Sequence, residues 1–178
     1  FLSFAWWQDK PQWENADWLA PRLAVDMSFE EYKTNKDPVL DACLSFNDNN
    51  AIVDPISHLR DLYLARKMSA LESEALKMVA DPRYRYINFE SNFNEAGYKL
   101  LNDHQMEGAL YVFGLNTRLF PKSANAWDSY AEAHWKSGKL DQAIEYYKKA
   151  IELDPHGETG RNAKETLKRV MAEKGKPE

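Results

Sequence analysis

The sequence predicts an all-α fold built from repeated pairs of helices, and three observations support this class. The chain matches itself when it is shifted by 34 residues, which is a period typical of helical repeats. The matching positions recur at steps of three and four, as on one face of a helix. Each copy also ends in a proline, which cannot continue a helix. The matched pairs are Phe93 with Trp127, Gly97 with Ala131, Ala109 with Ala143, Phe113 with Tyr147, Leu119 with Leu153, and Pro121 with Pro155.

Residues 90–156 are therefore expected to form two helical hairpins. In the first helix of each hairpin a small residue, Gly97 or Ala131, lies where two helices must approach closely. The second helices carry apolar stripes of their own. Ser123 is suited to cap the third of these helices at its N terminus, and Gly138 is suited to end it.

The order of residue types in each copy resembles the tetratricopeptide (TPR) repeat, whose unit is a pair of antiparallel helices. An aromatic residue is followed by a small residue, then by an alanine with an aromatic residue four positions later, then by the closing proline. The resemblance covers residues 90–156, which is 67 of 178 residues. It implies a module that binds other proteins through the concave face of its first helices and performs no chemistry.

Two units leave an apolar face uncovered at each end, because about three repeats are needed for a stable stack. Downstream, a Lys/Glu-rich helix over residues 159–174 is expected to cap the stack, with Gly175 and Pro177 closing it. Upstream, Asp54-Pro55 starts an apolar stripe that ends at Asp81-Pro82, and we expect one helix of about 25 residues there. The stripe consists of Leu64, Met68, Leu71, Ala75 and Val79.

The first 53 residues differ from the rest, so we predict a Trp-rich segment over 1–53 and a helical repeat domain over 54–178. The segment holds four of the six tryptophans, and alternating apolar residues predict two short strands. Because two short strands leave sheet edges unpaired, we interpret the segment as the end of a domain whose larger part is missing. The tryptophans are Trp6, Trp7, Trp13 and Trp18, and the alternating residues are Leu2, Phe4 and Trp6, then Leu23, Val25 and Met27.

Part of this segment also resembles the strand and helix that close the catalytic domain of C-terminal-processing serine peptidases. Residues 21–44 contain a Pro-x-x-x-Val stretch followed by Asp37-Pro38-Val-Leu, and Asp37-Pro38 by itself predicts a short helix through Leu44. The resemblance implies that the TPR part is an appendage of a serine hydrolase. It does not imply that this chain hydrolyses anything.

Composition restricts the classes of partner. Of 23 Lys/Arg and 28 Asp/Glu, residues 1–53 hold 4 and 9, which leaves 19 of each for the remainder and places the net charge of −5 in the front segment. No basic patch with interleaved aromatic residues is present, which argues against a nucleic-acid partner. The single cysteine, Cys43, excludes an internal disulfide and a cysteine metal site. No apolar run is long enough to span a membrane.

The chain begins at Phe1 without a signal-peptide pattern, and we expect it to be a processed protein or a piece of a longer one. The sequence does not fix the compartment. A periplasmic or secreted location follows if the parent is an exported hydrolase.

The sequence contains none of the common catalytic motifs. Gly-x-Ser-x-Gly, Ser-x-x-Lys, a phosphate-binding glycine loop and His-Glu-x-x-His are all absent, so we predict no catalytic residue, no metal ligand and no cofactor. His134 is expected to be a hydrogen-bonded core histidine. His58 can be drawn as a dyad with Asp54 and Asp61, but we interpret these acids as first-turn residues favoured by the helix dipole.

The TPR resemblance implies which residues form the concave face. A carboxylate clamp for chaperone tails is absent, because its places hold Asn94, Tyr98, Ser129, Thr159 and Ala163. Packing against a neighbouring helix or the front segment is the alternative role for Tyr98 and Trp135. The predicted ligand-binding residues are Asn94, Tyr98, Leu101, Asn102, Asp128, Glu132, Trp135 and Lys136.

Three hypotheses about function follow. The chain is a non-catalytic TPR interaction module at the C terminus of a larger hydrolase, which binds a peptide or packs on its own missing catalytic domain. Alternatively, it is the substrate-orienting tail of an active peptidase, or a free-standing adaptor or scaffold. We also expect self-association through residues 1–53, because four exposed tryptophans carry more apolar area than a monomer normally leaves uncovered.

Overall fold

The computed structural model describes residues 21–47 and 52–175, and in these ranges the protein is all-α, with no strand. This confirms the predicted class. The predicted strand around Phe4 and the four front tryptophans lie outside the described residues. In chain order the elements are α1 (Phe29–Lys33), α2 (Pro38–Ser45), α3 (Pro55–Leu64), α4 (Met68–Ala80), the 3-10 turn η1 (Pro82–Tyr84), α5 (Phe89–Asn102), α6 (Met106–Leu119), α7 (Ala124–Lys136), α8 (Leu140–Leu153) and α9 (Glu158–Lys174).

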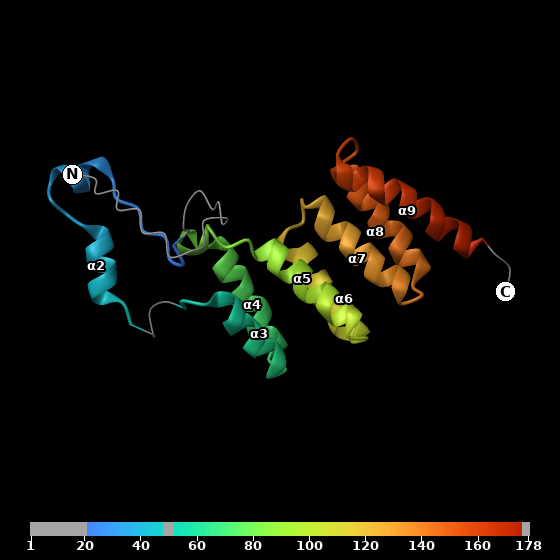
Figure 1. The fold of residues 1–178 in the computed structure, drawn as a ribbon, viewed down its shortest axis with the longest axis horizontal. Helices are drawn as coiled ribbons and strands as arrows, with labels where there is room; N and C mark the ends of the chain where they lie inside the picture. Colours follow the sequence, from blue (N-terminus) through green and yellow to red (C-terminus); the bar gives the residue numbers. More distant parts are fainter. Residues whose placement is uncertain (1–20, 48–51, 176–178) are drawn as a thin grey trace, which may run out of the picture.

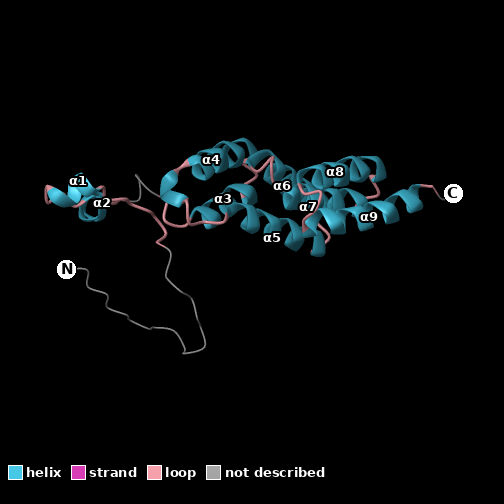
Figure 2. Ribbon diagram, turned by 90° about the horizontal axis from the view of Figure 1, so that it is seen from above, coloured by secondary structure: helices cyan, strands magenta, loops and turns pink. Residues whose placement is uncertain are grey.

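Three helical hairpins, α3/α4, α5/α6 and α7/α8, lie side by side, and α9 covers the last of them (Figure 1). Helix α4 packs on α6, α6 on α7 and α8 on α9, so each hairpin contacts its neighbours in sequence. Seen at right angles, the helices form an elongated array (Figure 2). The two predicted units and the capping helix are confirmed, and α9 begins within one residue of its expected start.

The turns of the three hairpins have the same backbone structure. In each turn one residue is left-handed: Arg66 at φ 58°, His104 at 59° and Gly138 at 76°. Its N–H donates to the carbonyl three residues back, and the next N–H donates to a carbonyl five residues back, for example from Lys139 to His134 at 2.9 Å. These bonds are those of a Schellman motif. Of the three left-handed residues only Gly138 is of a type that predicts this motif from the sequence.

The predicted single helix over 54–81 is wrong, because the chain reverses at Ala65–Lys67 and forms α3 and α4 instead. A continuous helix could not bury both apolar faces of this stretch. Leu59 on α3 and Leu71 on α4 join one core cluster only after the chain folds back. Leu64, assigned to the single stripe, is 67% exposed. No Gly, Pro or Asn marks this turn.

Small residues set the spacing inside the hairpins, as expected. A Cβ atom at Gly97 would lie 2.6 Å from the ring of Phe113, which is fully buried. Ala131 occupies the matching place in the next hairpin, in one core cluster with Tyr147. Ser123 caps α7 by accepting a hydrogen bond from the Ala126 N–H at 3.1 Å.

The junction between α8 and α9 depends on an aspartate and two glycines. The carboxylate of Asp154 accepts hydrogen bonds from the N–H groups of Gly157, at 2.8 Å, and Gly160, at 3.2 Å. A Cβ atom at Gly160 would lie 1.6 Å from the backbone oxygen of Asp154. The first turn of α9 therefore approaches the end of α8 too closely for any side chain at position 160.

Residues 21–47 lie at one end of the array and contain no strand, so the strand predicted over Leu23–Met27 is wrong. This stretch is irregular chain that lies against η1, where the Ala24 N–H donates to the Arg83 carbonyl at 2.7 Å. The predicted short helix is confirmed as α2, whose N terminus Asp37 caps. Helix α1 was not predicted, although Ser28 and Glu31 form a capping box.

Helix α2 stands apart from the hairpins in Figure 1, and neither α1 nor α2 has a buried residue. An amphipathic helix of eight residues normally buries its apolar face. Here the segment leaves eight large apolar side chains exposed: Val25, Met27, Phe29, Tyr32, Val39, Leu40, Leu44 and Phe46. The predicted boundary between residues 53 and 54 stays a prediction.

Candidate functional site

The predicted ligand-binding residues lie on α5 and α7, which pack against each other, and α7 in turn packs against α9. Asn102 and Lys136 are exposed at the C-terminal ends of their helices. Asn94, Tyr98, Asp128, Glu132 and Trp135 are partly buried. We call the surface formed by these residues the inner face.

Leu101 does not belong to the inner face. It is 7% exposed and packs in a core cluster with Ala109, Phe113 and Ala133. Its expected role as a ligand contact is therefore corrected to packing. In the second hairpin the position that matches Leu101 is occupied by Trp135, which is partly exposed. The repeat alignment alone therefore assigns one residue too many to the inner face of the first hairpin.

Tyr98 joins the two hairpins across the inner face. Its hydroxyl donates to a carboxylate oxygen of Glu132 at 2.8 Å and lies 3.3 Å from the Ser129 hydroxyl. The ring stacks edge-on against Phe113 at 5.1 Å. Glu132 also forms an ion pair with Lys136 at 2.7 Å. Tyr98 thus packs against a neighbouring helix and offers its polar edge to the surface.

Asp128 lies one helical turn before Glu132 and has no hydrogen bond or ion pair among the described residues. Burial raises the pKa of its carboxyl group to about 6, and the charge of Glu132 adds to the effect. No basic group contributes to lowering this pKa. Burial of a carboxylate without a hydrogen-bond donor lowers the stability of the folded state. Packing alone therefore does not account for an aspartate at position 128.

Tyr147 on α8 packs against α7 in one core cluster with Ala131. The sequence predicts Tyr147 only as a core residue. Tyr147 is 2% exposed, yet its hydroxyl has no hydrogen-bond partner in the described part of the chain. Burial raises its pKa first, followed by the charges of Asp128, Glu132 and Tyr98, while Arg169 lowers it. Trp135 of α7 packs against the same core cluster. Ala131 and Trp135 lie on the same side of α7 as Asp128 and Glu132, because residues three and four apart share one helix face. We call Tyr98, Asp128, Glu132 and Tyr147 the acid–phenol cluster.

Trp135 closes the inner face toward α9. Its indole N–H donates to a carboxylate oxygen of Glu173 at 2.8 Å, and the guanidinium of Arg169 lies over its ring at 5.3 Å. The expected alternative, packing against a neighbouring helix, thus applies to Trp135 as well as to Tyr98. At the other end, the side-chain oxygen of Asn94 is buried without a hydrogen-bond partner.

His134 is buried, as expected, but it is not hydrogen-bonded. The prediction of a hydrogen-bonded core histidine is therefore wrong in this respect. Both ring nitrogens lack a partner, and the ring packs edge-on against Tyr130 at 4.5 Å and Tyr146 at 5.1 Å. Burial lowers the pKa of His134 to about 4, with a smaller contribution from Lys139. The ring is therefore neutral at physiological pH and acts as a core side chain.

His58 pairs with Glu74 on α4, and not with Asp54 or Asp61. Asp54 caps α3 through the Ser57 N–H, and Asp61 contacts Arg60. The dyad drawn from the sequence does not form. Within residues 21–47 and 52–175, no three His, Cys, Asp or Glu side chains are grouped so that they could hold a metal ion.

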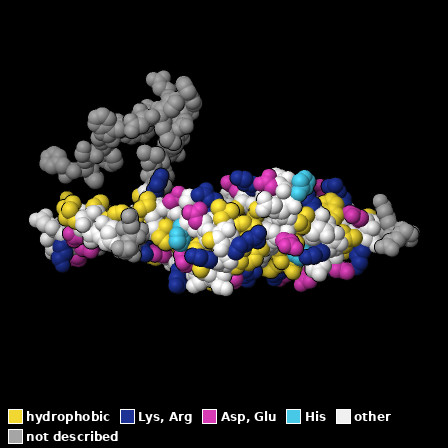
Figure 3. Space-filling view, turned by 90° about the horizontal axis from the view of Figure 1, so that it is seen from below, with side chains coloured by type: hydrophobic (Ala, Val, Ile, Leu, Met, Phe, Trp, Pro, Cys, Tyr) yellow, Lys and Arg dark blue, Asp and Glu magenta, His cyan; other side chains and the backbone are white. Residues whose placement is uncertain are grey.

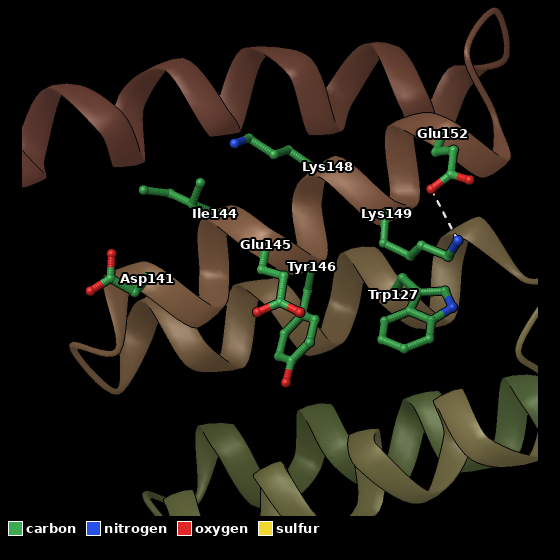
Figure 4. Close-up of a pocket in the computed structure, with 8 residues that line it drawn as sticks. All are labelled: Trp127, Asp141, Ile144, Glu145, Tyr146, Lys148, Lys149 and Glu152. Carbon is green, nitrogen blue, oxygen red and sulfur yellow. Dashed lines mark hydrogen bonds and ion pairs between the residues drawn. The ribbon is translucent and has the colours of Figure 1, made fainter.

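The described residues also form a shallow groove of about 490 Å³ on the outward side of α8 (Figure 4). Trp127 and Tyr146 line one part of it, with their rings 5.6 Å apart, and Lys149 pairs with Glu152 at 3.0 Å. The other lining residues are Asp141, Ile144, Glu145 and Lys148. Acidic and basic side chains alternate here, as they do over the face shown in Figure 3. The groove contains no unpaired group comparable to Asp128.

The comparison with protein families agrees with this geometry. Residues 124–156, which comprise α7 and α8, match the family model described as tetratricopeptide repeat. The second hairpin is therefore similar to a TPR repeat. Such repeats are protein–protein interaction modules and are not catalytic. None of the curated proteins matches the chain.

Several solved structures are similar to this chain. PcrH in complex with the chaperone binding region of PopD has 20% sequence identity and a TM-score of 0.46, and the match covers 70% of this chain and 97% of PcrH. The first TPR domain of human RPAP3 has 17% identity and a TM-score of 0.44, with 68% and 93% covered. The Sgt2 TPR domain from Aspergillus fumigatus has 21% identity and a TM-score of 0.43, with 70% and 83% covered.

The comparisons give no link to a peptidase or another hydrolase. The resemblance over residues 21–44 also loses its strand, since Leu23–Met27 forms none. No described helix is both long and apolar enough to cross a membrane.

Proposed function

We propose that this protein binds a peptide segment of a partner protein on its inner face and holds it without chemical change. The observation that carries the proposal is the polar surface shared by α5, α7 and α9, where unpaired and partly buried groups meet aromatic side chains. A peptide laid across α5 and α7 would contact Asn94, Tyr98, Asp128, Glu132 and Trp135. A hydrogen bond of 2.8 Å between Tyr98 and Glu132 joins the two helices there.

Selection of peptides from a random 12-residue phage library on the immobilised protein tests this proposal. We expect selected peptides to lose affinity when Asn102→Arg or Lys136→Ala changes the exposed edge of the inner face, because both side chains lie outside the core. Glu145→Arg on the outward side of α8 is the matched control and should leave binding unchanged. Peptides that respond only to Glu145→Arg would place the binding surface on the outer groove and reject the proposal.

Self-association is a second candidate role, and the exposed apolar side chains of α1 and α2 favour it. Leu44 is 76% exposed and Phe29 is 73% exposed, which is unusual for two large apolar side chains in one short segment. Sedimentation velocity should show concentration-dependent association that disappears in a Leu40→Ser, Leu44→Ser variant. Leu64→Ser, at an exposed leucine at the C-terminal end of α3, is the control. Association unchanged by the double variant would reject this role.

The finer hypothesis, that the module belongs to the C-terminal part of a serine hydrolase, rests on the resemblance of residues 21–44 alone. Of the two elements in that resemblance, the helix forms as α2 and the strand does not. We therefore favour an adaptor or scaffold role, in which the inner face binds the partner.

A further inference from the structure

The acid–phenol cluster differs in kind from the remainder of the inner face, because it contains two groups that the protein itself leaves unpartnered. The Asp128 carboxylate and the Tyr147 hydroxyl have no hydrogen bond within the described ranges. Tyr147 is 2% exposed, so its hydroxyl is largely removed from solvent. A buried polar group left without a partner lowers stability, and a ligand that completes its bonding recovers this loss.

We propose that the acid–phenol cluster binds the cationic side chain of a lysine or arginine in the peptide that occupies the inner face. This inference rests on the proposed function and adds the chemistry of the ligand. The ammonium or guanidinium group donates hydrogen bonds to the Asp128 carboxylate and to the oxygen of Tyr147, and its charge balances that of Asp128. Glu132, fixed by the Tyr98 hydroxyl at 2.8 Å, extends the negative field on the same side.

The neighbouring basic side chains of the protein do not themselves neutralise the charge of Asp128. Lys136 is bound to Glu132 at 2.7 Å, and Arg169 lies over the Trp135 ring. Neither forms a hydrogen bond or an ion pair with Asp128 within the described ranges. An incoming cation therefore meets an uncompensated carboxylate. An anionic ligand would be repelled by both acids, consistent with the absence of a carboxylate clamp.

The first hairpin provides an internal control, because the repeat packs the same way there without the cluster. The places of Asp128 and Tyr147 are held by Asn94 and Phe113. Phe113 is fully buried like Tyr147, and so a phenol is not required for packing at this position. The Tyr147 hydroxyl and the Asp128 carboxylate of the second hairpin are thus not required for the packing of the repeat.

Titration of the ¹⁵N-labelled full chain with N-acetyl-lysine amide and N-acetyl-arginine amide tests the inference by NMR. We expect saturable shifts of the backbone amides of Asp128, Glu132 and Tyr147. N-acetyl-norleucine amide, which has the same aliphatic length without the charge, should produce none. Asp128→Asn should weaken binding of the lysine probe by about tenfold or more, because it removes one member of a charge pair. Tyr147→Phe should weaken it by a smaller factor, and Glu145→Gln on the outward side of α8 should have no effect.

Three results would overturn the inference: equal shifts with the norleucine probe, lysine binding unchanged in both Asp128→Asn and Tyr147→Phe, or no saturable binding of either cation. The two substitutions give unit two the residue types of unit one, so a preserved amide spectrum shows that the fold is intact. Peptides selected on the inner face without lysine or arginine would reject the cation site but not the proposed function. Cation binding without any peptide on the inner face would reject the proposed function and the peptide origin of the cation.

Discussion

The hairpins α5/α6 and α7/α8 use the same packing positions but give them different polar chemistry. Gly97 faces Phe113 in one and Ala131 accompanies Tyr147 in the other, so the core contacts are equivalent. On the inner face, however, the first hairpin presents an amide where the second presents an unpaired carboxylate. A repeat therefore fixes the backbone and the core, while single side chains on that backbone decide what the surface recognises.

The ends of the two hairpins differ as well. The first passes to α7 through the side chain of Ser123, which also donates to Glu90 at 2.6 Å. The second passes to α9 through the carboxylate of Asp154, which accepts hydrogen bonds from the N–H groups of Gly157 and Gly160. The second junction is the tighter one, and it should be the more sensitive to substitution.

The largest effect is expected from Gly160→Ala, which tests this difference between the junctions. The new methyl group meets the Asp154 carbonyl at 1.6 Å, so α9 must move away from α8. We expect a loss of about 3 kcal/mol or more in the free energy of unfolding, measured by urea denaturation. Gly175→Ala in the same helix is the control, since the nearest atom there is 3.5 Å away. Equal stability of the two variants would show that the junction is loose.

Overpacking of the first hairpin should cost less, because a side chain rather than the backbone opposes it. Gly97→Ala places a methyl group 2.6 Å from the Phe113 ring, and we expect a loss of about 1 to 3 kcal/mol. Phe113→Leu in the same chain should reduce this loss in a double-mutant cycle. Ala131→Leu in the second hairpin should cost a similar amount. Wild-type stability of Ala131→Leu would mean that the two hairpins do not share their helix pairing.

His134→Phe should stabilise the protein most at mildly acidic pH. The folded-state pKa of about 4 lies below the ordinary value of 6.5, so between these values the unfolded chain binds more protons and stability falls as the pH falls. The advantage of the phenylalanine variant should therefore be larger at pH 5 than at pH 7.5 by about 2 kcal/mol. His104→Phe, at an exposed position, is the control. An advantage independent of pH would show that His134 is charged in the folded state or solvated.

A fragment that begins at Asp54 should still unfold cooperatively, because the stack is stabilised by contacts between neighbouring hairpins. It loses the hydrogen bond from Ala24 to Arg83 and the contact of Leu23 with the core cluster of α3 and α4. We expect a decrease of about 1 to 2 kcal/mol in the free energy of unfolding. Thermal denaturation followed by circular dichroism provides the measurement. A fragment with no cooperative transition would make residues 21–47 part of the repeat domain.

The smallest effect is expected from Asp128→Asn, which gives the second hairpin the residue type of the first at this position. The folded-state pKa of about 6 lies above the ordinary 3.8, so stability is lost as the pH rises through this interval. The charged group that acts on Asp128 is Glu132, which is also negative, and Tyr98 and Tyr147 are the titratable groups on the neighbouring helices that its charge affects. We expect a gain on the order of 1 kcal/mol at pH 7.5 and no gain at pH 3.5, by urea denaturation. A loss at pH 7.5 would mean that the carboxylate has a stabilising partner.

The sequence by itself determined the period, the helix pairs of residues 90–156 and the capping helix. These follow from apolar spacing and from Ser123, Gly138 and the two closing prolines, which act within one or two helical turns. It also predicted the ligand-binding residues of the inner face from matching repeat positions, and their role in binding stays a prediction.

Only the tertiary structure decided the break between α3 and α4, the junction at Gly160 and the acid–phenol cluster. Arg66 adopts a left-handed turn without any local preference for it, because two apolar faces must reach one core. Gly160 is required by a contact with Asp154 that exists only after α9 docks. Tyr147 reads as a core aromatic in the sequence, and its hydroxyl becomes part of a site only where α5, α7, α8 and α9 meet. Local spacing encodes helices, whereas the partners of a polar atom depend on which helices come together.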